Sequence, residues 1–266
     1  MTSAKANSSI ESLLESGDLY LTFESKGRHS GSCIRVIAEN MGDEFILTTI
    51  APGRKLAAAN EASQDIIITQ EVILALSPNQ VIQRDIFGFC GQSQNRNPEY
   101  ESRYYLGAMA DSRTIKIATY LNKHRLIPES DQQAAIWVST DCHPLSSINR
   151  INQEGLDLIK YTASVYGMPS PWYSTEHAQT VDQLFSAKVN RVYGEIPFQI
   201  TQSDMIHIVI IDDSGRIMKR LISAKYGPGK YTLPVDLMVH NWPSGAYNVQ
   251  FESKNHGTFA DYSFNI

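Results

Sequence analysis

Short runs of alternating apolar and polar residues dominate residues 1–90. After a polar lead and a predicted helical turn at Ile10–Leu14, Leu19–Phe23 alternates as a half-buried strand does. Further runs rich in Ile, Val, Phe and Thr, separated by Gly, Pro, Asn and Ser, predict strands at Cys33–Ala38, Glu44–Ile50, Asp65–Thr69, Glu71–Leu76 and Val81–Phe89. Strands with this spacing predict an N-terminal β-sandwich.

The period of the apolar residues changes after residue 90. A polar segment, Gly91–Glu101, is predicted to be irregular, and a three-helix segment follows over residues 105–166. The helical spacing predicts helices at Ser112–Lys123, Ser130–Thr140 and Gln153–Val165. Asp111 or Ser112 is the expected cap of the first helix, while Ser130 and Gln133 have the spacing of a capping box in the second.

Glycine and proline at positions 167–171 predict a linker that continues through Ser174. Within it, Trp172 and Tyr173 are expected to pack against a neighbouring part of the chain. We place the domain boundary at Gln179–Lys188, which gives domains at residues 1–180 and 188–266.

The strand pattern returns after this boundary, and no helix is predicted there. Predicted strands are Lys188–Tyr193, Ile196–Thr201, Ile206–Asp212, Ile217–Ser223, Gly229–Pro234, Ala246–Ser253 and Phe259–Ile266. The turn Asp212–Gly215 supplies the acceptors and the glycine that a tight hairpin requires. The chain is therefore predicted to be mainly β, with a second β-sandwich at its C-terminus.

Composition limits the classes of partner. With 42% apolar and 19% charged residues, a chain of 266 residues can bury the cores of two domains. The formal charge of −5 and the absence of a long basic run argue against nucleic acid. Apolar runs such as Met205–Ile211 are strand-length, so no membrane span is expected. Met1–Ser9 has no apolar stretch typical of a secretory signal, which predicts a cytoplasmic protein if Met1 is native, and a secreted or surface protein if the chain is a mature form.

Three C-terminal segments carry a family resemblance. These are Ile208–Leu221 with its Asp-Asp-Ser-Gly turn, Tyr226–Leu233 with Gly227 and Gly229, and Trp242–Val249 with its Gly-Ala-Tyr step. Together they resemble the sorting domain that ends type IX-secreted proteins of Bacteroidetes, and are similar to the immunoglobulin-like domain of flagellar-hook capping proteins. The resemblance implies an immunoglobulin-like sandwich and a role in secretion or surface attachment.

The sharpest chemical candidate combines Cys90 with the second predicted helix. Phe89-Cys90 ends the last N-terminal strand, and the helix carries Gln133-Ala-Ala-Ile-Trp-Val. The pair resembles the thioester domains of Gram-positive surface adhesins, although Gln132 stands where that family has Thr. The resemblance implies an internal Cys-to-Gln thioester, formed with loss of ammonia, that acylates amines. The alternative interpretation is an inert helix packed on a sheet.

A second chemical interpretation is a cysteine hydrolase. Cys90 would be its nucleophile, His124 or His143 its base, and Asp131 or Asp141 the group that orients the base. No oxyanion-type turn beyond the flanking glycines accompanies the cysteine.

Metal and cofactor signals are weak. His29 with Cys33, and Cys142 with His143, are possible ligand pairs, but neither forms a Cys-x-x-Cys arrangement. The chain has no phosphate loop, dinucleotide fingerprint or nucleophile elbow, so no metal or cofactor is predicted.

These observations favour a non-enzymatic protein for surface attachment, adhesion or protein binding, whose C-terminal module serves sorting or docking and whose partner is a protein or a cell-surface ligand. The segment Pro98–Tyr105 is rich in aromatic and charged residues, as recognition loops are. The first alternative is a thioester-forming or cysteine-dependent acylating protein that uses Cys90. The second is a cytoplasmic structural or assembly protein that forms an oligomer or a filament.

Overall fold

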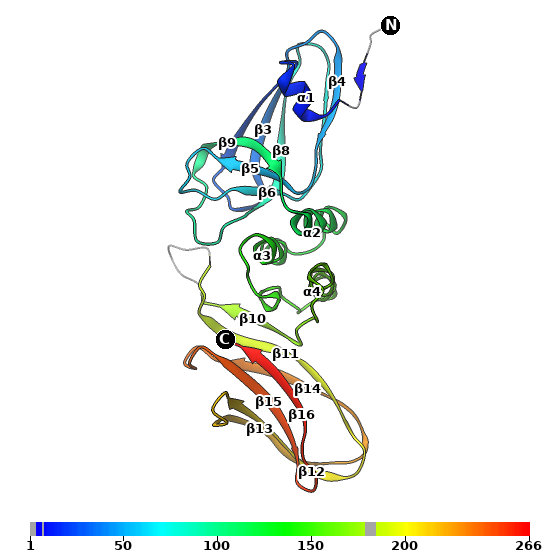
Figure 1. Ribbon diagram of the computed structural model, residues 1–266, viewed down its shortest axis with the longest axis vertical. Helices are drawn as coiled ribbons and strands as arrows, with labels where there is room; N and C mark the ends of the chain where they lie inside the picture. Colours follow the sequence, from blue (N-terminus) through cyan, green and yellow to red (C-terminus); the bar gives the residue numbers. More distant parts are fainter. Residues whose placement is uncertain (1–3, 7, 179–184) are drawn as a thin grey trace. The chain divides into compact units, whose positions relative to one another are not determined.

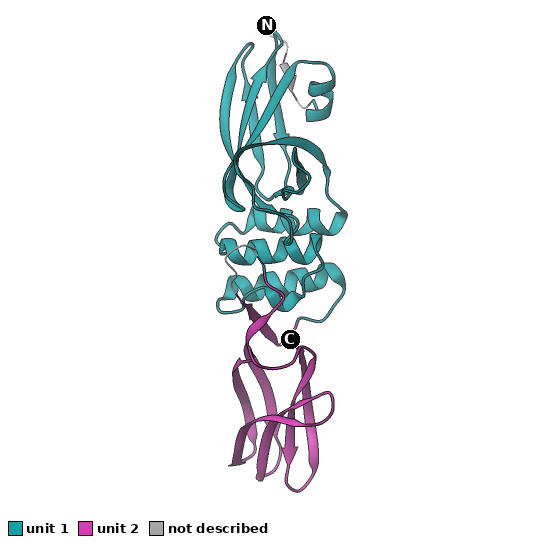
Figure 2. Ribbon diagram, turned by 90° about the vertical axis from the view of Figure 1, so that its left-hand side faces the viewer, with its two compact units in different colours: residues 1–170, 180–185 teal, residues 171–179, 186–266 magenta. Residues whose placement is uncertain are grey.

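The chain forms two compact units (Figure 2). The computed structural model describes residues 4–6, 8–178 and 185–266. The first unit extends to Ser170 and includes Phe185, and the second contains Pro171–Ala178 and the chain from Ser186 onward. The predicted boundary at Gln179–Lys188 lies in part outside the described residues.

Six strands of the first unit close into a barrel (Figure 1). Their order around it is β2 (Leu19–Lys26), β3 (Ser30–Asn40), β8 (Val81–Cys90), β6 (Ile66–Ile68), β5 (Arg54–Ala58) and β9 (Tyr100–Met109). A smaller sheet contains β1 (Ala4–Ala6), β4 (Phe45–Ile50) and β7 (Val72–Leu76), and the predicted helical turn is α1 (Ile10–Glu15).

The barrel differs from the two-sheet sandwich that the sequence predicts for residues 1–90. The strand that closes it is β9, which pairs with β2 on one side and with β5 on the other. Neither β5 nor β9 is in the predicted set, and most of β9 comes from the segment predicted as a recognition loop. Strand spacing alone predicts the sandwich, and without β5 and β9 the remaining strands could not close into a barrel.

The interior of the barrel is filled by alternate side chains of its strands. In β3, for example, Ile34, Val36 and Ala38 are fully buried, while Arg35 and Ile37 between them are partly exposed. Cys33 and Cys90 belong to the same buried cluster. This alternation is the period-2 pattern from which the strands were predicted.

Three helices pack against one end of the barrel, and the predicted helices are confirmed. They are α2 (Ser112–Lys123), α3 (Glu129–Thr140) and α4 (Gln153–Tyr166), with a short 3₁₀ turn, η1 (Leu145–Ser147), between the last two. Phe89 of β8 is buried among apolar residues of all three helices. None of the described helices is long and apolar enough to cross a membrane.

The start of α3 differs from its prediction. Asp111 caps α2, accepting from the amides of Arg113 and Thr114, but α3 begins after Pro128 with no side-chain cap. The capping box predicted from Ser130 and Gln133 is therefore wrong. The reason is tertiary, because the Gln133 amide has its partners on the barrel.

The second unit consists of two antiparallel sheets around one apolar core. One contains β10 (Tyr173–His177), β11 (Val189–Ile200) and β14 (Gly229–Met238), and the other has the order β13 (Ile217–Tyr226), β12 (Asp204–Asp212), β15 (Ala246–Ser253) and β16 (Gly257–Asn265). Two predicted strands merge into β11, and the predicted linker provides β10, so the packing expected of Trp172 and Tyr173 is confirmed within this unit.

The predicted hairpin between β12 and β13 is confirmed. Asp212 accepts from the Ser214 amide at 3.1 Å and from the Ser214 hydroxyl at 2.6 Å, and Gly215 takes a φ of +80°. The carboxylate of Asp212 closes the turn, so its role is explained by the structure of the hairpin.

Candidate functional site

Cys90 and Gln133 lie together at the junction of barrel and helices. The Gln133 side chain donates through Nε2 to the Cys90 carbonyl at 2.8 Å, and its Oε1 accepts from the Cys90 amide at 3.2 Å. That amide also donates to the His29 carbonyl at 3.1 Å. The structure thus brings the predicted pair into contact, with the glutamine bonded to the backbone of Cys90.

The thiol of Cys90 has a different environment from its backbone. Successive side chains of a strand point to opposite faces, so Phe89 contacts the helices and Cys90 belongs to the barrel core. Burial raises the pKa of the Cys90 thiol far above its ordinary value, and burial raises that of Cys33 to about 12. Since the thiolate is the nucleophilic form, neither thiol is activated in this conformation.

The other predicted residues on the helices have local partners. Gln132 donates through Nε2 to the Ile127 carbonyl at 2.7 Å, which closes the turn before α3. His124 follows the last residue of α2 and stacks on Tyr120, with ring centroids 4.1 Å apart. Burial raises the pKa of Asp131 to about 6, despite a hydrogen bond from the Asn149 backbone.

Asp141 and His143 meet at Ser93, a residue that sequence reasoning missed. Ser93 donates to Asp141 through its hydroxyl and, at 2.7 Å, through its amide. His143 Nε2 lies 2.9 Å from the same hydroxyl and 3.6 Å from the carboxylate. The Ser93 hydroxyl donates to Asp141 rather than to the imidazole, unlike in a hydrolase in which histidine accepts the serine proton.

The sequence carries no signal for this cluster, since Ser93 is 48 positions from Asp141 in an irregular segment. No group of three or more potential metal ligands occurs among the residues that the structure describes, so the pairs at His29 and at Cys142 have no third ligand there.

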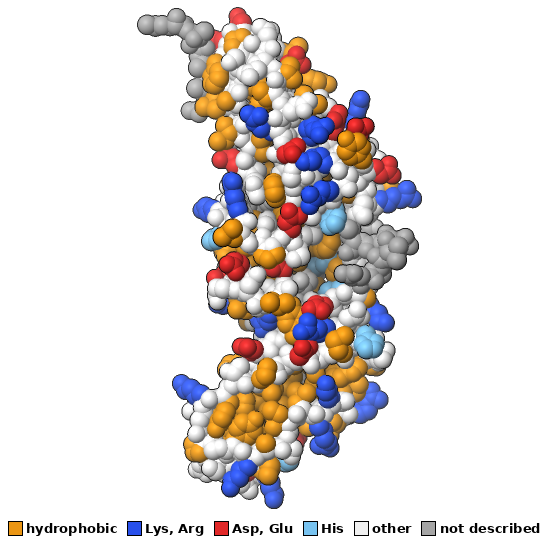
Figure 3. Space-filling model, turned by 180° about the vertical axis from the view of Figure 1, so that it is seen from behind, with side chains coloured by type: hydrophobic (Ala, Val, Ile, Leu, Met, Phe, Trp, Pro, Cys, Tyr) orange, Lys and Arg blue, Asp and Glu red, His pale blue; other side chains and the backbone are white. Residues whose placement is uncertain are grey.

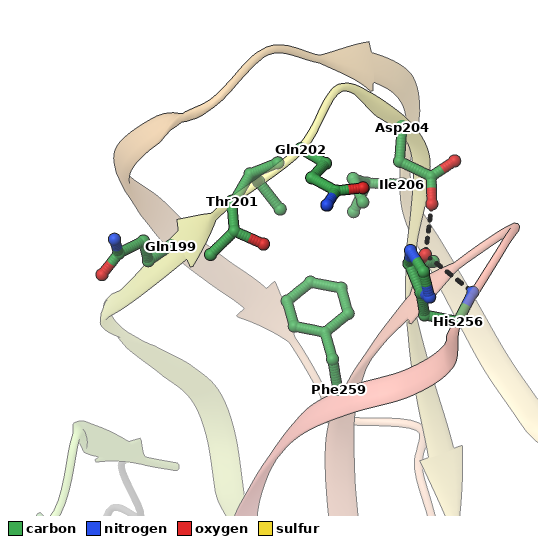
Figure 4. A pocket seen from close by; sticks show the side chains of 9 residues that line it. Gln199, Thr201, Gln202, Asp204, Ile206, His256 and Phe259 are labelled. Atoms are coloured by element: carbon green, nitrogen blue, oxygen red, sulfur yellow. Dashed lines mark hydrogen bonds between the residues drawn. The ribbon is translucent and has the colours of Figure 1, made fainter.

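The second unit contains two adjoining cavities. We call the smaller one, of about 290 Å³, the Phe259 cavity (Figure 4). Its lining comprises Gln199, Ile200, Thr201, Gln202, Asp204, Ile206, Ser253, His256 and Phe259. The larger, of about 570 Å³, shares Gln199 and Phe259 with it and adds the partly buried rings of Tyr231 and Tyr262. We call the two cavities, which share these lining residues, the groove at Phe259.

The Phe259 ring lies in the middle of the smaller cavity (Figure 4). It is 40% exposed, although its ring also contacts that of Phe251. Three exposed polar side chains lie on one side of it, Gln199, Thr201 and Gln202, and the structure gives them no hydrogen bond within its described part. They are therefore available to a ligand.

Asp204, on the opposite side, is already engaged. Its Oδ1 accepts from the Met205 amide at 2.7 Å and from Asn255 Nδ2 at 2.8 Å, and its Oδ2 accepts from the Ser253 hydroxyl. These bonds, that of Ser253 above all, hold the pKa of Asp204 below its ordinary value. The carboxylate shapes one end of the cavity, and the side chains of Gln199, Thr201, Gln202 and His256 are the polar groups of the lining for which the structure gives no hydrogen bond in its described part.

The groove lies along strand edges that are protected against strand addition. β10 pairs with β11 only as far as Gly194, and Pro197, on the remaining edge, has no N–H to offer. The Pro197 carbonyl accepts from the Tyr262 hydroxyl at 3.0 Å. On the edge of β16, the Ser263 carbonyl accepts from Trp172 Nε1 at 2.8 Å. We therefore expect a ligand in this groove to be bound by side chains rather than by backbone groups of the strand edges.

Hydrophobic side chains also gather on the surface of this unit, as Figure 3 shows for one face.

Comparison with protein families, curated proteins and solved structures finds no match to the chain.

Proposed function

We propose that the chain is a non-enzymatic surface-attachment protein whose second unit binds a saccharide in the groove at Phe259. The observation that carries the proposal is an exposed aromatic ring inside a cavity, with amide and hydroxyl groups that have no described partner beside it. Small-ligand sites are concave, largely apolar, and contain a few orienting polar groups.

The chemistry of the lining favours a sugar. One face of a sugar ring carries C–H groups, which pack against the electron-rich face of an aromatic ring. Amide side chains such as Gln199 and Gln202 both donate and accept, and so match hydroxyl groups, which do the same. The Asp204 carboxylate is satisfied within the unit, so this position does not require a cationic ligand.

The strand edges argue against the main alternative, a peptide that adds a strand to the sheet. Pro197 has no N–H to donate to such a peptide, and the carbonyls of Pro197 and Ser263 already accept from Tyr262 and Trp172. The predicted immunoglobulin-like sandwich is compatible with this proposal, since the unit has two sheets around one core. Sorting for secretion remains a prediction from the resemblance.

The alternatives based on Cys90 and on self-assembly also remain predictions. The two hydrogen bonds between Gln133 and the backbone of Cys90, together with the buried thiol, support a structural role for this pair. We therefore propose that Cys90 has a structural role in the first unit and takes part in no reaction.

Binding to a panel of immobilised neutral and acidic oligosaccharides, with extended proline-rich and β-forming peptides alongside, tests the proposal. We expect at least one neutral oligosaccharide to bind, and Phe259→Ala to weaken it about tenfold or more through loss of the stacking surface. Gln202→Ala should weaken it as well, without touching the apolar core. Met238→Ala, which removes an exposed side chain of the same unit outside both cavities, is the matched control and should leave binding unchanged. Binding of peptides alone, or of no probe, would overturn the proposal.

A further inference from the structure

The first unit contains a pocket that plays no part in the function proposed above. It has a volume of about 470 Å³ and lies where the N-terminal end of α2 meets the C-terminal ends of α3 and α4. Val138, Leu145 and Met168 provide apolar walls. We call it the Arg113 pocket, after the only Lys or Arg in its lining.

The Arg113 guanidinium is held in place by aromatic contact. It lies over the ring of Tyr166, with 4.8 Å from Cζ to the ring centroid, and the Tyr166 hydroxyl donates to the Val138 carbonyl at 3.2 Å. The ring is therefore fixed, and the stacked cation is oriented before any ligand arrives.

Asp111, which lines the same pocket, is engaged as a helix cap and forms no ion pair with this cation. Asp111 accepts from the Thr114 hydroxyl at 2.6 Å and from the amides of Arg113 and Thr114 at 2.9 and 3.2 Å, as the cap of α2. Within the described residues, the guanidinium of Arg113 forms no ion pair. The stacked guanidinium therefore lines a pocket that combines the apolar side chains named above with the polar residues Asp111, Ser139 and His143.

We propose that the Arg113 pocket binds a small organic carboxylate, with the carboxylate on Arg113 and an apolar body against Val138, Leu145 and Met168. The planar guanidinium matches a carboxylate with two parallel hydrogen bonds, which is the strong, charge-assisted kind. The volume is that of an ordinary small-molecule site. Cys142, an exposed thiol in the same lining, lies close enough to report occupancy.

The test uses octanoate and 4-phenylbutyrate as probes, each beside its primary amide, with the full chain. We expect both carboxylates to bind and each amide to bind about tenfold more weakly or worse, since it lacks the charge. Arg113→Gln should reduce carboxylate binding to the level of the amides. Arg125→Gln, which removes an exposed arginine just beyond the other end of α2, should have no effect.

A second readout does not depend on the variants. Saturating octanoate should slow the alkylation of Cys142 by iodoacetamide, and octanamide at the same concentration should not. Equal binding of acid and amide, unchanged binding in Arg113→Gln, or no binding of either acid at millimolar concentration would each overturn the assignment, as would alkylation of Cys142 at an unchanged rate under saturation.

Discussion

The side-chain amide of Gln133 forms two hydrogen bonds with the backbone of Cys90, donating to its carbonyl and accepting from its amide. A residue of α3 therefore provides the donor for the Cys90 carbonyl and shares the Cys90 amide with the His29 carbonyl at the end of β8. Because both groups are buried, the pair joins the helices to the barrel and satisfies polar backbone atoms that water does not reach.

Replacing Gln133 by Ala should destabilise the first unit. Two buried hydrogen bonds are lost, while the Cys90 amide keeps its bond to the His29 carbonyl, so we expect a loss of about 1–3 kcal/mol in the free energy of unfolding. Gln153→Ala, on the exposed start of α4, is the control and should change it by less than about 0.5 kcal/mol. Urea unfolding followed by the helical circular dichroism signal measures this, since all described helices belong to the first unit.

The three thiols should differ in reactivity. Cys142 is exposed, whereas Cys33 and Cys90 are buried with raised pKa values, so an aromatic disulfide reagent should titrate Cys142 in the native protein and all three after denaturation. The intact mass should equal that of the sequence. A mass lower by about 17 Da, restored in Cys90→Ala, would instead establish a thioester and contradict the structural role of this pair.

The stability of the first unit should depend on the charge of Asp131. Its carboxyl has a pKa of about 6 when folded, above the ordinary value of 3.8, so the folded state binds the proton more tightly than the unfolded state does. The unfolding free energy should therefore fall as the pH rises from about 4 to about 6. Above that range the carboxyl is ionised in the folded state, and the decrease in stability should be complete.

Asp131→Asn should remove this dependence while keeping an oxygen acceptor for the Asn149 amide. Relative to this variant, the wild type should be less stable at pH 7 than at pH 4, in urea midpoints measured at both. Glu154→Gln, which removes an exposed carboxylate from the first turn of α4, controls for position in a helix. A difference between Asp131→Asn and the wild type that is the same at both pH values would show that the folded carboxyl is not perturbed.

The protection of backbone amides at the edge of β16 against hydrogen exchange should depend on single aromatic side chains. The Asn265 amide donates to the Tyr173 hydroxyl at 3.1 Å. In Tyr173→Phe this amide should exchange its hydrogen faster, by up to about tenfold, because it loses its acceptor. Tyr262→Phe loses only the bond to the Pro197 carbonyl and should leave the Asn265 exchange rate unchanged. Equal rates in Tyr173→Phe and the wild type would contradict this account of edge protection.

Elements with a clear local period could be predicted from sequence. The helix at Ser112–Lys123 has the predicted bounds because an apolar face and a good cap at Asp111 act together in a short stretch. The hairpin at Asp212 was predictable for the same reason. β9 was missed because its exterior positions carry Tyr and charged residues and its start has no alternation, so only closure of the barrel reveals its role.

The sites were less predictable than the elements. The motif around Gln133 pairs this residue with Cys90, and the structure places the two in contact, but the sequence could not say that the bonds go to the backbone rather than to the thiol. Ser93, Arg113 and Phe259 gave no signal at all, since each gains its meaning from residues distant in the chain. A pocket is a property of the tertiary arrangement, and a lone arginine or phenylalanine in a sequence is not distinguishable from its many counterparts.

The proposed saccharide site is tested most directly by nuclear magnetic resonance, with the best-binding neutral oligosaccharide titrated into labelled protein. The account predicts that the side-chain NH₂ signals of Gln199 and Gln202 and the ring signals of Phe259 shift with one common dissociation constant, while signals of the first unit stay unchanged, and that Phe259→Ala abolishes the shifts. Shifts confined to the first unit, or the same shifts in Phe259→Ala, would contradict it.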